Sequence, residues 1–398
     1  MENLQLKSNI VVNDQPMDIV RSLAKKIDWN DRLIGIVGAR GTGKTTILLQ
    51  RLKEVYGLSK AAIYITMDDI YFTAHKLSDF ALQFRQQGGK ILFIDEVHKY
   101  PDWAREIKNI YDFYKDLKIV FTGSSIIDIS RQNADLSRRA VQYELAGLSY
   151  REYLHFSGIA RPELIRWKDL LENHVEISHQ FSNTFKPLQH FADYLRYGYY
   201  PFFMDNVNTY HIRIEKVVRL IIEDDLQFID GFNPHHSRKV YQLLYILATN
   251  VPFKPNLSKL AEKTGIDRNL IVKYLHYLES ARLINTLSAA GRSTSILQKP
   301  DKLLMENTNI LYALSSENVD KGTLRETFFM NQLKNAGHEV KLPLKGDFFI
   351  DDQYTFEIGG QRKTNKQLAG LADSFVVADD IESGIGTKIP LWLFGMCS

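Results

Sequence analysis

The feature that most constrains this chain is a glycine-rich octapeptide near its amino end. Residues 38–45 fit the pattern G-x-x-x-x-G-K-[ST] and lie between an apolar run at 33–37 and another at 46–49. Apolar runs on both sides predict a strand, a tight loop and a helix, which is the context in which this pattern binds phosphate. Backbone N–H groups at the start of such a helix point at phosphate oxygens. The sequence therefore predicts a nucleotide-binding loop.

The residue types in the loop suit particular tasks. Its glycines allow the tight turn that brings the backbone to the phosphates. Lys44 adds a positive charge for the β- and γ-phosphates, and the hydroxyl of Thr45 suits Mg²⁺. The predicted nucleotide-binding residues are Gly38, Ala39, Arg40, Gly41, Thr42, Gly43, Lys44, Thr45 and Thr46.

Length and composition bound the class of protein. A chain of 398 residues exceeds one ordinary core, so several domains are expected. The net charge of +3 excludes a polycation, and the single cysteine, Cys397, excludes an internal disulfide framework. No apolar run approaches the roughly 18 residues of a membrane span. We expect a cytoplasmic protein with no membrane partner.

A second motif follows the third of four predicted strands, which are expected at 33–37, 61–67, 90–95 and 118–123 with helices between them. Strands that alternate with helices predict an α/β fold with a parallel sheet. The third strand ends in Asp95 and Glu96, a Walker B pattern in which Asp95 would hold Mg²⁺ and Glu96 would orient or deprotonate the attacking water. The extra strand between the two motifs indicates the ATPase branch that uses a catalytic glutamate.

Two further catalytic candidates follow the fourth strand. Ser124 is predicted to lie between the Walker B residues and the γ-phosphate, with Thr122 and Ser125 as alternatives. A serine that caps a helix would explain the same residue. Arg139, with Arg138 as its alternative, could stabilise charge on the transferred phosphoryl group, within the chain or from a neighbouring subunit. A solvated basic turn is the competing interpretation.

Residues 93–112, 121–125 and 136–154 together resemble the AAA-type archaeal and bacterial ATPase family, an AAA+/STAND-related group of P-loop proteins. The resemblance covers about residues 10–155. It implies ATP as ligand and a five-stranded core. It also implies the nucleotide, metal and catalytic roles of Lys44, Thr45, Asp95 and Glu96, a sensor role for Ser124 and an arginine role for Arg139.

The middle of the chain predicts a helical connector at 158–235 and a winged helix-turn-helix at 236–298. Between His235 and Arg282, eight lysine and arginine residues stand against three acidic residues, and a basic face is typical of phosphate contacts. The candidate nucleic-acid contacts lie off the apolar face of the third helix and are Arg268, Asn269, Lys273 and His276. Such domains also serve as packing modules in multidomain ATPases.

Residues 299–315 resemble the uncharacterised C-terminal domain that accompanies these ATPases. The rest of the C-terminal part predicts a helix at 322–335, strands at 338–342, 347–350 and 353–358, a helix at 364–372 and a strand at 374–378. That order resembles the restriction-endonuclease (PD-(D/E)XK) core.

Metal-dependent cleavage of a phosphodiester needs acidic ligands and a nearby lysine. The candidates are Glu326, Asp347, Glu357 and Lys363, with Lys366 as an alternative lysine. The family pattern places its lysine two residues after the second acid, where this chain has Gly359. A degenerate fold that binds or packs without cutting is the favoured interpretation.

These features predict an α/β P-loop ATPase domain at 1–157, the connector, the winged helix, and a nuclease-like α/β domain at 299–398. We expect an ATP-hydrolysing, Mg²⁺-dependent AAA+-type switch coupled to double-stranded DNA or to a protein partner, which includes self-association. One alternative is an ATP-dependent, metal-requiring DNA nuclease. Another is an interaction module that binds ATP without turnover.

Overall fold

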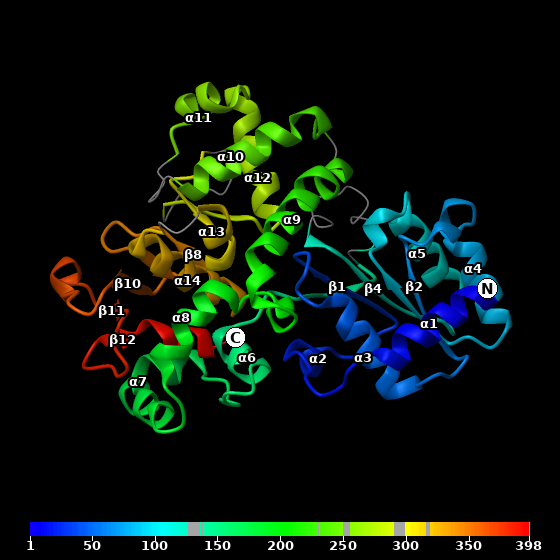
Figure 1. Ribbon diagram of the computed structural model, residues 1–398, viewed down its shortest axis with the longest axis horizontal. Helices are drawn as coiled ribbons and strands as arrows, with labels where there is room; N and C mark the ends of the chain where they lie inside the picture. Colours follow the sequence, from blue (N-terminus) through cyan, green and yellow to red (C-terminus); the bar gives the residue numbers. More distant parts are fainter. Residues whose placement is uncertain are drawn as a thin grey trace. The chain divides into compact units, whose positions relative to one another are not determined.

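The computed structural model describes the chain except for residues 126–135, 137, 230, 250–254, 290–298, 316–318 and 398. The chain forms two compact units (Figure 1). The first contains Met1–Ala146 and Asp224–Phe232, and the second contains Gly147–Glu223 and Asn233–Ser398. The first unit therefore ends before the predicted boundary at residue 157 and takes a short segment from the predicted connector. None of the helices in the described ranges is long and apolar enough to cross a membrane.

A five-stranded parallel sheet forms the centre of the first unit. Its strands are β1 (Leu33–Gly38), β2 (Ala62–Thr66), β3 (Ile91–Asp95), β4 (Lys118–Ser124) and β5 (Val141–Glu144). Their order in the sheet is β2-β3-β4-β1-β5, and every neighbouring pair is parallel. The four predicted strands are confirmed, and β5 supplies the fifth strand that the family resemblance implied.

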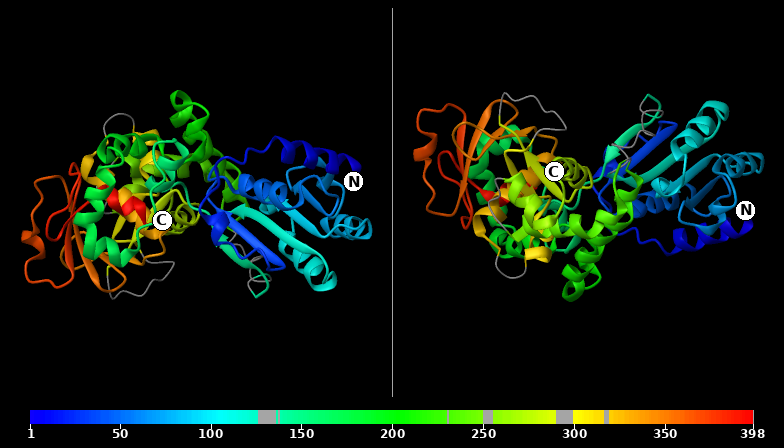
Figure 2. Two further views of the ribbon diagram at one scale, coloured as in Figure 1. Left: turned by 90° about the horizontal axis from the view of Figure 1, so that it is seen from below. Right: turned by 90° about the horizontal axis from the view of Figure 1, so that it is seen from above.

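Helices cover both faces of this sheet (Figure 2). They are α1 (Glu2–Asp14), α2 (Leu23–Lys26), α3 (Lys44–Tyr56), α4 (Leu77–Gln86) and α5 (Trp103–Phe113). Successive side chains of a strand point to opposite faces, so Leu92 and Ile94 join one buried cluster while Phe93 joins the other. Burial on both faces explains why these strands read as nearly continuous apolar runs.

The second unit begins with helices and continues with a helix-rich segment that ends in a small sheet. The first group is α6 (Tyr150–Phe156), α7 (Trp167–Ser182), α8 (Pro187–Tyr197) and α9 (Tyr210–Glu223). The next group is α10 (Ser237–Thr249), α11 (Leu257–Thr264), α12 (Arg268–Ser280), β6 (Ile284–Leu287) and β7 (Lys302–Met305). β6 and β7 pair antiparallel. The aromatic residues Tyr194, Tyr199 and Tyr200 are buried in this unit, so they are core rather than an exposed stacking surface.

The C-terminal part of the second unit contains α13 (Thr308–Ser315), α14 (Lys321–Asn335) and a five-stranded sheet. The strands are β8 (Val340–Lys341), β9 (Phe348–Ile350), β10 (Tyr354–Gly359), β11 (Ser374–Ala378) and β12 (Lys388–Pro390). Their order is β12-β11-β10-β9-β8. The predicted helix at 364–372 is wrong, because only a 3₁₀ turn forms at Asn365–Leu368 before Gly370 adopts a φ of +83°. β12 was not predicted.

Candidate functional site

The loop between β1 and α3 has the backbone that a phosphate-binding loop requires. Gly41 and Gly43 have φ angles of +85° and +97°, a region that favours glycine. A Cβ atom on Gly38 would lie 2.3 Å from the carbonyl oxygen of Leu145, so a side chain does not fit there. The glycines therefore allow a tight turn from β1 into α3, with the backbone N–H groups of the loop at the amino end of α3.

A buried arginine that the sequence did not single out supports the loop from behind. Arg21 donates through Nη1 to the carbonyl oxygen of Thr42 at 2.6 Å and through Nη2 to that of Ala146 at 2.8 Å. These charge-assisted hydrogen bonds fix the loop backbone against the segment that follows β5. Arg21, which precedes β1 in the chain, thus contributes to the shape of the phosphate-binding loop.

Lys44 lies within the loop and donates to the carbonyl oxygens of Gly38 and Ala39, both at 2.9 Å. Burial lowers the pKa of Lys44, while the carboxylates of Glu96 and Asp95 act in the opposite direction. The Lys44 ammonium group accordingly lies buried near carboxylates, and these hydrogen bonds go to backbone carbonyl oxygens. A phosphate group brings further negative charge to the loop.

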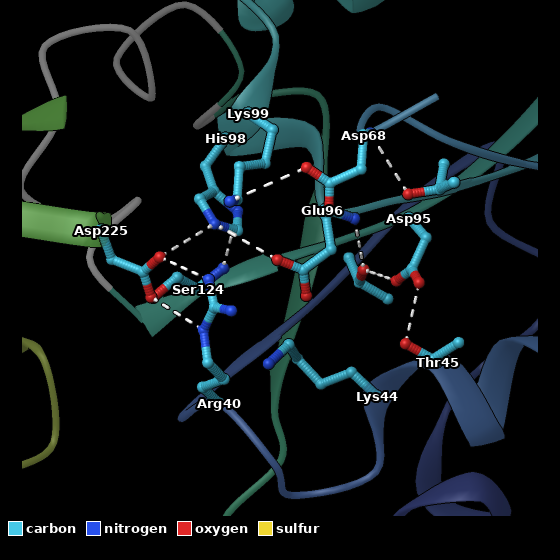
Figure 3. Close-up of polar contacts among 12 residues, drawn as sticks. Arg40, Lys44, Thr45, Asp68, Asp95, Glu96, His98, Lys99, Ser124 and Asp225 are labelled. Atoms are coloured by element: carbon cyan, nitrogen blue, oxygen red, sulfur yellow. Dashed lines mark hydrogen bonds and ion pairs between the residues drawn. The ribbon is translucent and has the colours of Figure 1, made fainter. Parts of the chain in front are cut away.

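Asp95 ends β3 and accepts hydrogen bonds from three hydroxyl groups, of which that of Thr45 is labelled in Figure 3. Thr45 Oγ1 and Tyr64 OH each donate to Oδ2 at 2.8 Å, and Thr122 Oγ1 donates to Oδ1. The predicted metal pair, Thr45 and Asp95, therefore lies together at the carboxyl end of the sheet. Hydroxyl and carboxylate oxygens are ligands that suit Mg²⁺, so the residues present fit this ion. The contribution of Tyr64 was not predicted.

Glu96 follows Asp95 in an unusual backbone conformation. Its φ and ψ are +54° and +43°, the left-handed region, which costs a non-glycine residue about 1–3 kcal/mol. The Glu96 N–H donates to Thr122 Oγ1 at 3.0 Å, which helps to hold this turn. The Glu96 side chain is 22% exposed. Glu96 is thus set apart from the buried Asp95 and remains accessible to a water molecule.

Among the three candidates for the sensor position, Thr122 makes the side-chain contacts. Its hydroxyl joins Asp95 to the backbone of Glu96. Ser124 is buried, and its backbone N–H donates to Nδ1 of His98 at 3.3 Å. The structure therefore connects β4 to the carboxylates through Thr122, while Ser124 remains a prediction as a sensor.

Arg139 lies away from the phosphate loop of its own chain. It binds Asp112, near the carboxyl end of α5, through two nitrogen atoms at 3.0 Å each. Arg139 precedes β5, and β5 runs parallel to β1, so this arginine lies at the amino ends of the strands while the loop lies at the carboxyl end of β1. This placement does not bring Arg139 to the phosphate loop of its own chain, so a role in a neighbouring subunit and a basic turn at the surface stay as predictions. Arg138 has the same limitation.

A carboxylate that is distant in sequence enters the site. The segment 224–232 packs in the first unit, and its 3₁₀ turn η7 (Asp225–Phe228) buries Asp225 to 1% exposure. Asp225 Oδ1 accepts from Arg40 Nη2 at 2.6 Å, and Oδ2 lies 3.4 Å from Nε (Figure 3). Burial raises the pKa of Asp225, but the nearby His98 and Arg40 outweigh burial and hold this pKa below its usual range. No local pattern in the sequence links Asp225 to Arg40.

In the second unit, the candidate nucleic-acid contacts lie on α12 as the sequence predicted. Asp267 caps this helix by accepting from the N–H of Asn269 at 2.8 Å. The buried face contains Ile271, Tyr274, Leu275 and Leu278. The candidates lie off that face, with Arg268 and Asn269 exposed and Lys273 and His276 half-buried.

The nuclease-like candidates lie on α14, β10 and the loops beside β9 and β10. Lys363 forms an ion pair with Glu357, while Asp347 accepts from the N–H of Ile358 at 2.7 Å. Glu326 binds Lys302 at 2.7 Å; burial raises the pKa of Glu326 and Lys302 opposes that rise. In the described part of the chain, no three histidine, cysteine or acidic residues gather as a metal site. Lys363, the predicted substitute for the missing lysine, thus contacts Glu357, but the described residues do not form a metal-binding cluster.

The first unit has the α/β fold and the loop that are typical of P-loop ATPases. The sheet order, the glycine-rich loop after β1 and the acidic pair after β3 carry this assignment. Comparison with known proteins agrees, since residues 30–154 match a family described as "AAA domain". Residues 188–321 match a domain of unknown function (DUF8612).

One relative is the uncharacterized protein MJ1637 of Methanocaldococcus jannaschii, which is 26% identical over 388 residues and covers 88% of this chain and 80% of that protein. Among solved structures, the Aeropyrum pernix Orc1 protein in complex with DNA is similar at 12% identity and a TM-score of 0.35, covering 79% of this chain and 92% of that one. AMPPCP-bound DnaA from Aquifex aeolicus is similar at 15% identity and a TM-score of 0.26, covering 66% and 89%. The class assignment therefore rests on the sheet, the loop and the family match.

The contact between Arg40 and Asp225 predicts a nucleotide affinity that a single charge change can raise. Asp225→Asn removes a negative charge beside the phosphate loop and weakens the contact that holds the side chain of Arg40. Because opposite charges attract most strongly where water is excluded, we expect the Kd for a nucleoside triphosphate to fall several-fold. Fluorescent-nucleotide titration measures this change.

Asp224→Asn is the matched control. It makes the same charge change one residue earlier in the chain. The Asp224 carboxylate attracts Arg40 through space, and the described part of the chain shows no hydrogen bond between these two side chains. We expect a smaller effect. Equal or weaker nucleotide binding by Asp225→Asn would contradict a restraining role for Asp225.

Proposed function

We propose that this protein is a Mg²⁺-dependent ATP-hydrolysing switch. The loop between β1 and α3 binds the phosphates through its N–H groups and Lys44. Thr45 and Asp95 hold the metal ion, which neutralises charge on the phosphate oxygens when it is bound. Glu96 orients the attacking water and accepts its proton.

The observation that carries this proposal is that two adjacent carboxylates, those of Asp95 and Glu96, have different surroundings. Asp95 is buried among three hydroxyl groups, whereas Glu96 turns away from it and stays partly exposed. A metal ligand needs a fixed, hydrogen-bonded carboxylate. A general base needs access to water. The two environments match the two tasks.

Glu96→Gln should separate binding from hydrolysis. We expect retained ATP binding and a turnover rate reduced by about 10²–10⁴-fold, because the amide keeps the size of the side chain but accepts a proton poorly. Phosphate release and nucleotide titration measure the two quantities. Lys44→Ala is the companion variant and should lose ATP binding itself.

If wild-type protein binds ATP but releases no phosphate, and Glu96→Gln behaves identically, the alternative of an interaction module without turnover replaces this proposal.

The coupling of the switch to double-stranded DNA rests on the geometry of residues 237–305. Three helices and an antiparallel strand pair follow one another in the order of a winged helix. Such domains place their third helix in the major groove of DNA, and here that helix is α12. Its polar side carries Arg268 and Lys273, which suit contacts to phosphates and bases.

Replacing Arg268 and Lys273 together by alanine should weaken DNA binding by full-length protein. We expect the slope of log affinity against log salt to fall by about one for each phosphate contact that is lost. Fluorescence anisotropy with a labelled duplex at several salt concentrations gives that slope. Lys168→Ala, on α7, is the control for charge alone.

Unchanged affinity and slope in the double variant would mean that α12 makes no DNA contact, and would favour a protein partner or a packing role.

A second candidate function, metal-dependent DNA cleavage, is favoured by one contact. Lys363 pairs with the buried Glu357 even though position 359 is glycine, so a lysine lies where the second acid needs it. Asp347 lies beside the same strand through its hydrogen bond to Ile358. These are the residue types that a PD-(D/E)XK site uses with a divalent cation.

Under this second candidate, full-length protein with Mn²⁺ should cut linear duplex DNA, and Asp347→Ala should abolish cutting because it removes an acidic ligand. Gel analysis of the DNA measures the activity. Asp352→Ala is the control, since Asp352 is exposed and binds Lys341 instead. The absence of metal-dependent cutting by wild-type protein would leave this domain with a binding or packing role.

A further inference from the structure

His98 lies between the side chain of Glu96 and the carboxylate of Asp225 (Figure 3). It belongs to a 3₁₀ turn, η2 (Val97–Lys99), that directly follows Glu96. Its Nε2 atom is 3.3 Å from Glu96 Oε2 and 3.7 Å from Asp225 Oδ1. One ring nitrogen therefore faces two carboxylates from segments far apart in sequence.

The contact at the other ring nitrogen, Nδ1, determines which nitrogen of His98 carries the ring proton. The N–H of Ser124 donates to Nδ1 at 3.3 Å, so Nδ1 must present its lone pair. The ring proton is then on Nε2, because the hydrogen bond at one nitrogen decides the tautomer at the other. His98 consequently offers an N–H donor to the two carboxylates.

The ring is held more firmly than Glu96 is. The side chain of His98 is 7% exposed and packs edge-on against Phe228, with ring centroids 6.0 Å apart. Asp225 is held by Arg40 and is also buried. Glu96 is the exposed member of the group, so a fixed donor and a fixed second acceptor face one adjustable carboxylate.

We propose that His98 is a positioning residue for Glu96. Its Nε2–H donates to Oε2 of Glu96 and leaves Oε1 to accept the proton of the attacking water. Asp225 Oδ1, 3.7 Å from the same nitrogen, is a second, buried carboxylate that favours this orientation of the ring. A base whose carboxylate is fixed in this way loses less activity to unproductive rotamers. This inference rests on the proposed hydrolysis of ATP by Glu96.

The proposal gives the segment 224–232 a direct route to the reacting atoms. This segment follows α9 and precedes α10 in the chain, and both of those helices belong to the second unit. If the segment leaves the first unit, Arg40 loses its partner and His98 loses its second acceptor. Arg40 lies in the phosphate loop and His98 faces Glu96, so each of these losses affects the site through one side chain.

Two amide variants test the role of the Nε2–H donor. The amide nitrogen of glutamine reaches about as far as Nε2, whereas asparagine places its polar atoms nearer the backbone, at the level of Nδ1. We expect His98→Asn to lower the single-turnover rate of ATP hydrolysis at least about tenfold, and His98→Gln to restore most of it. The Kd for ATP, measured separately, should stay within about twofold in both variants, since neither removes a phosphate contact.

His75→Asn is the matched control, because His75 is an exposed histidine of the same unit that stacks on Tyr71. It should hydrolyse ATP at the wild-type rate. Thermal unfolding of all the variants shows whether loss of activity follows loss of stability.

Three results would overturn the proposal. Wild-type rates in His98→Asn would show that the donor is not needed. Equal loss in the Asn and Gln variants, or a loss that tracks a lower Tm, would show a structural role only. Absence of hydrolysis by wild-type protein is a different result, because it removes the proposed ATPase function itself.

Discussion

The parallel pairing of β1, β3 and β4 is the constraint on which the site depends. In the register of the sheet, Gly38 lies opposite Ser124, and Ile94 lies opposite Phe121. This register brings the phosphate loop, the acidic pair and Thr122 to one edge of the sheet. Ligand sites of open α/β sheets form at the carboxyl ends of strands for the same reason. Each polar residue here is thus positioned by backbone hydrogen bonds inside a buried core.

Charge balance gives this edge its chemistry. Lys44 and Arg40 face three carboxylates, those of Asp95, Glu96 and Asp225. Each carboxylate has different partners: hydroxyl groups for Asp95, Arg40 for Asp225, and His98 for Glu96. A nucleoside triphosphate with its metal ion changes this balance more than any single side chain does. Arg40 and Asp225 form the hydrogen-bonded ion pair that lies beside this balance of charge.

Local sequence patterns predicted much of the fold and half of the site. Four strands, the loop and the face of α12 followed from periodicity and glycine spacing, since those are decided within a few residues. Asp225 could not be found in this way, because its partner Arg40 is 185 residues away and only tertiary packing joins them. The helix predicted at 364–372 is replaced by a 3₁₀ turn, because Gly370 adopts a left-handed backbone that ends the segment. The position of Arg139 could not be predicted, because it depends on the direction and register of β5, which the sequence did not place.

The segment 224–232 belongs to the first unit although the chain on both sides of it belongs to the second. It is a short excursion of the chain, and Asp225 is almost fully buried at its start. Its carboxylate binds the loop residue Arg40 and lies 3.7 Å from Nε2 of His98, the histidine that faces Glu96. A buried carboxylate that loses its cation is costly, so Asp225 and Arg40 move together or not at all. In the proposed switch, a displacement of this segment would change the surroundings of both Arg40 and His98 at once.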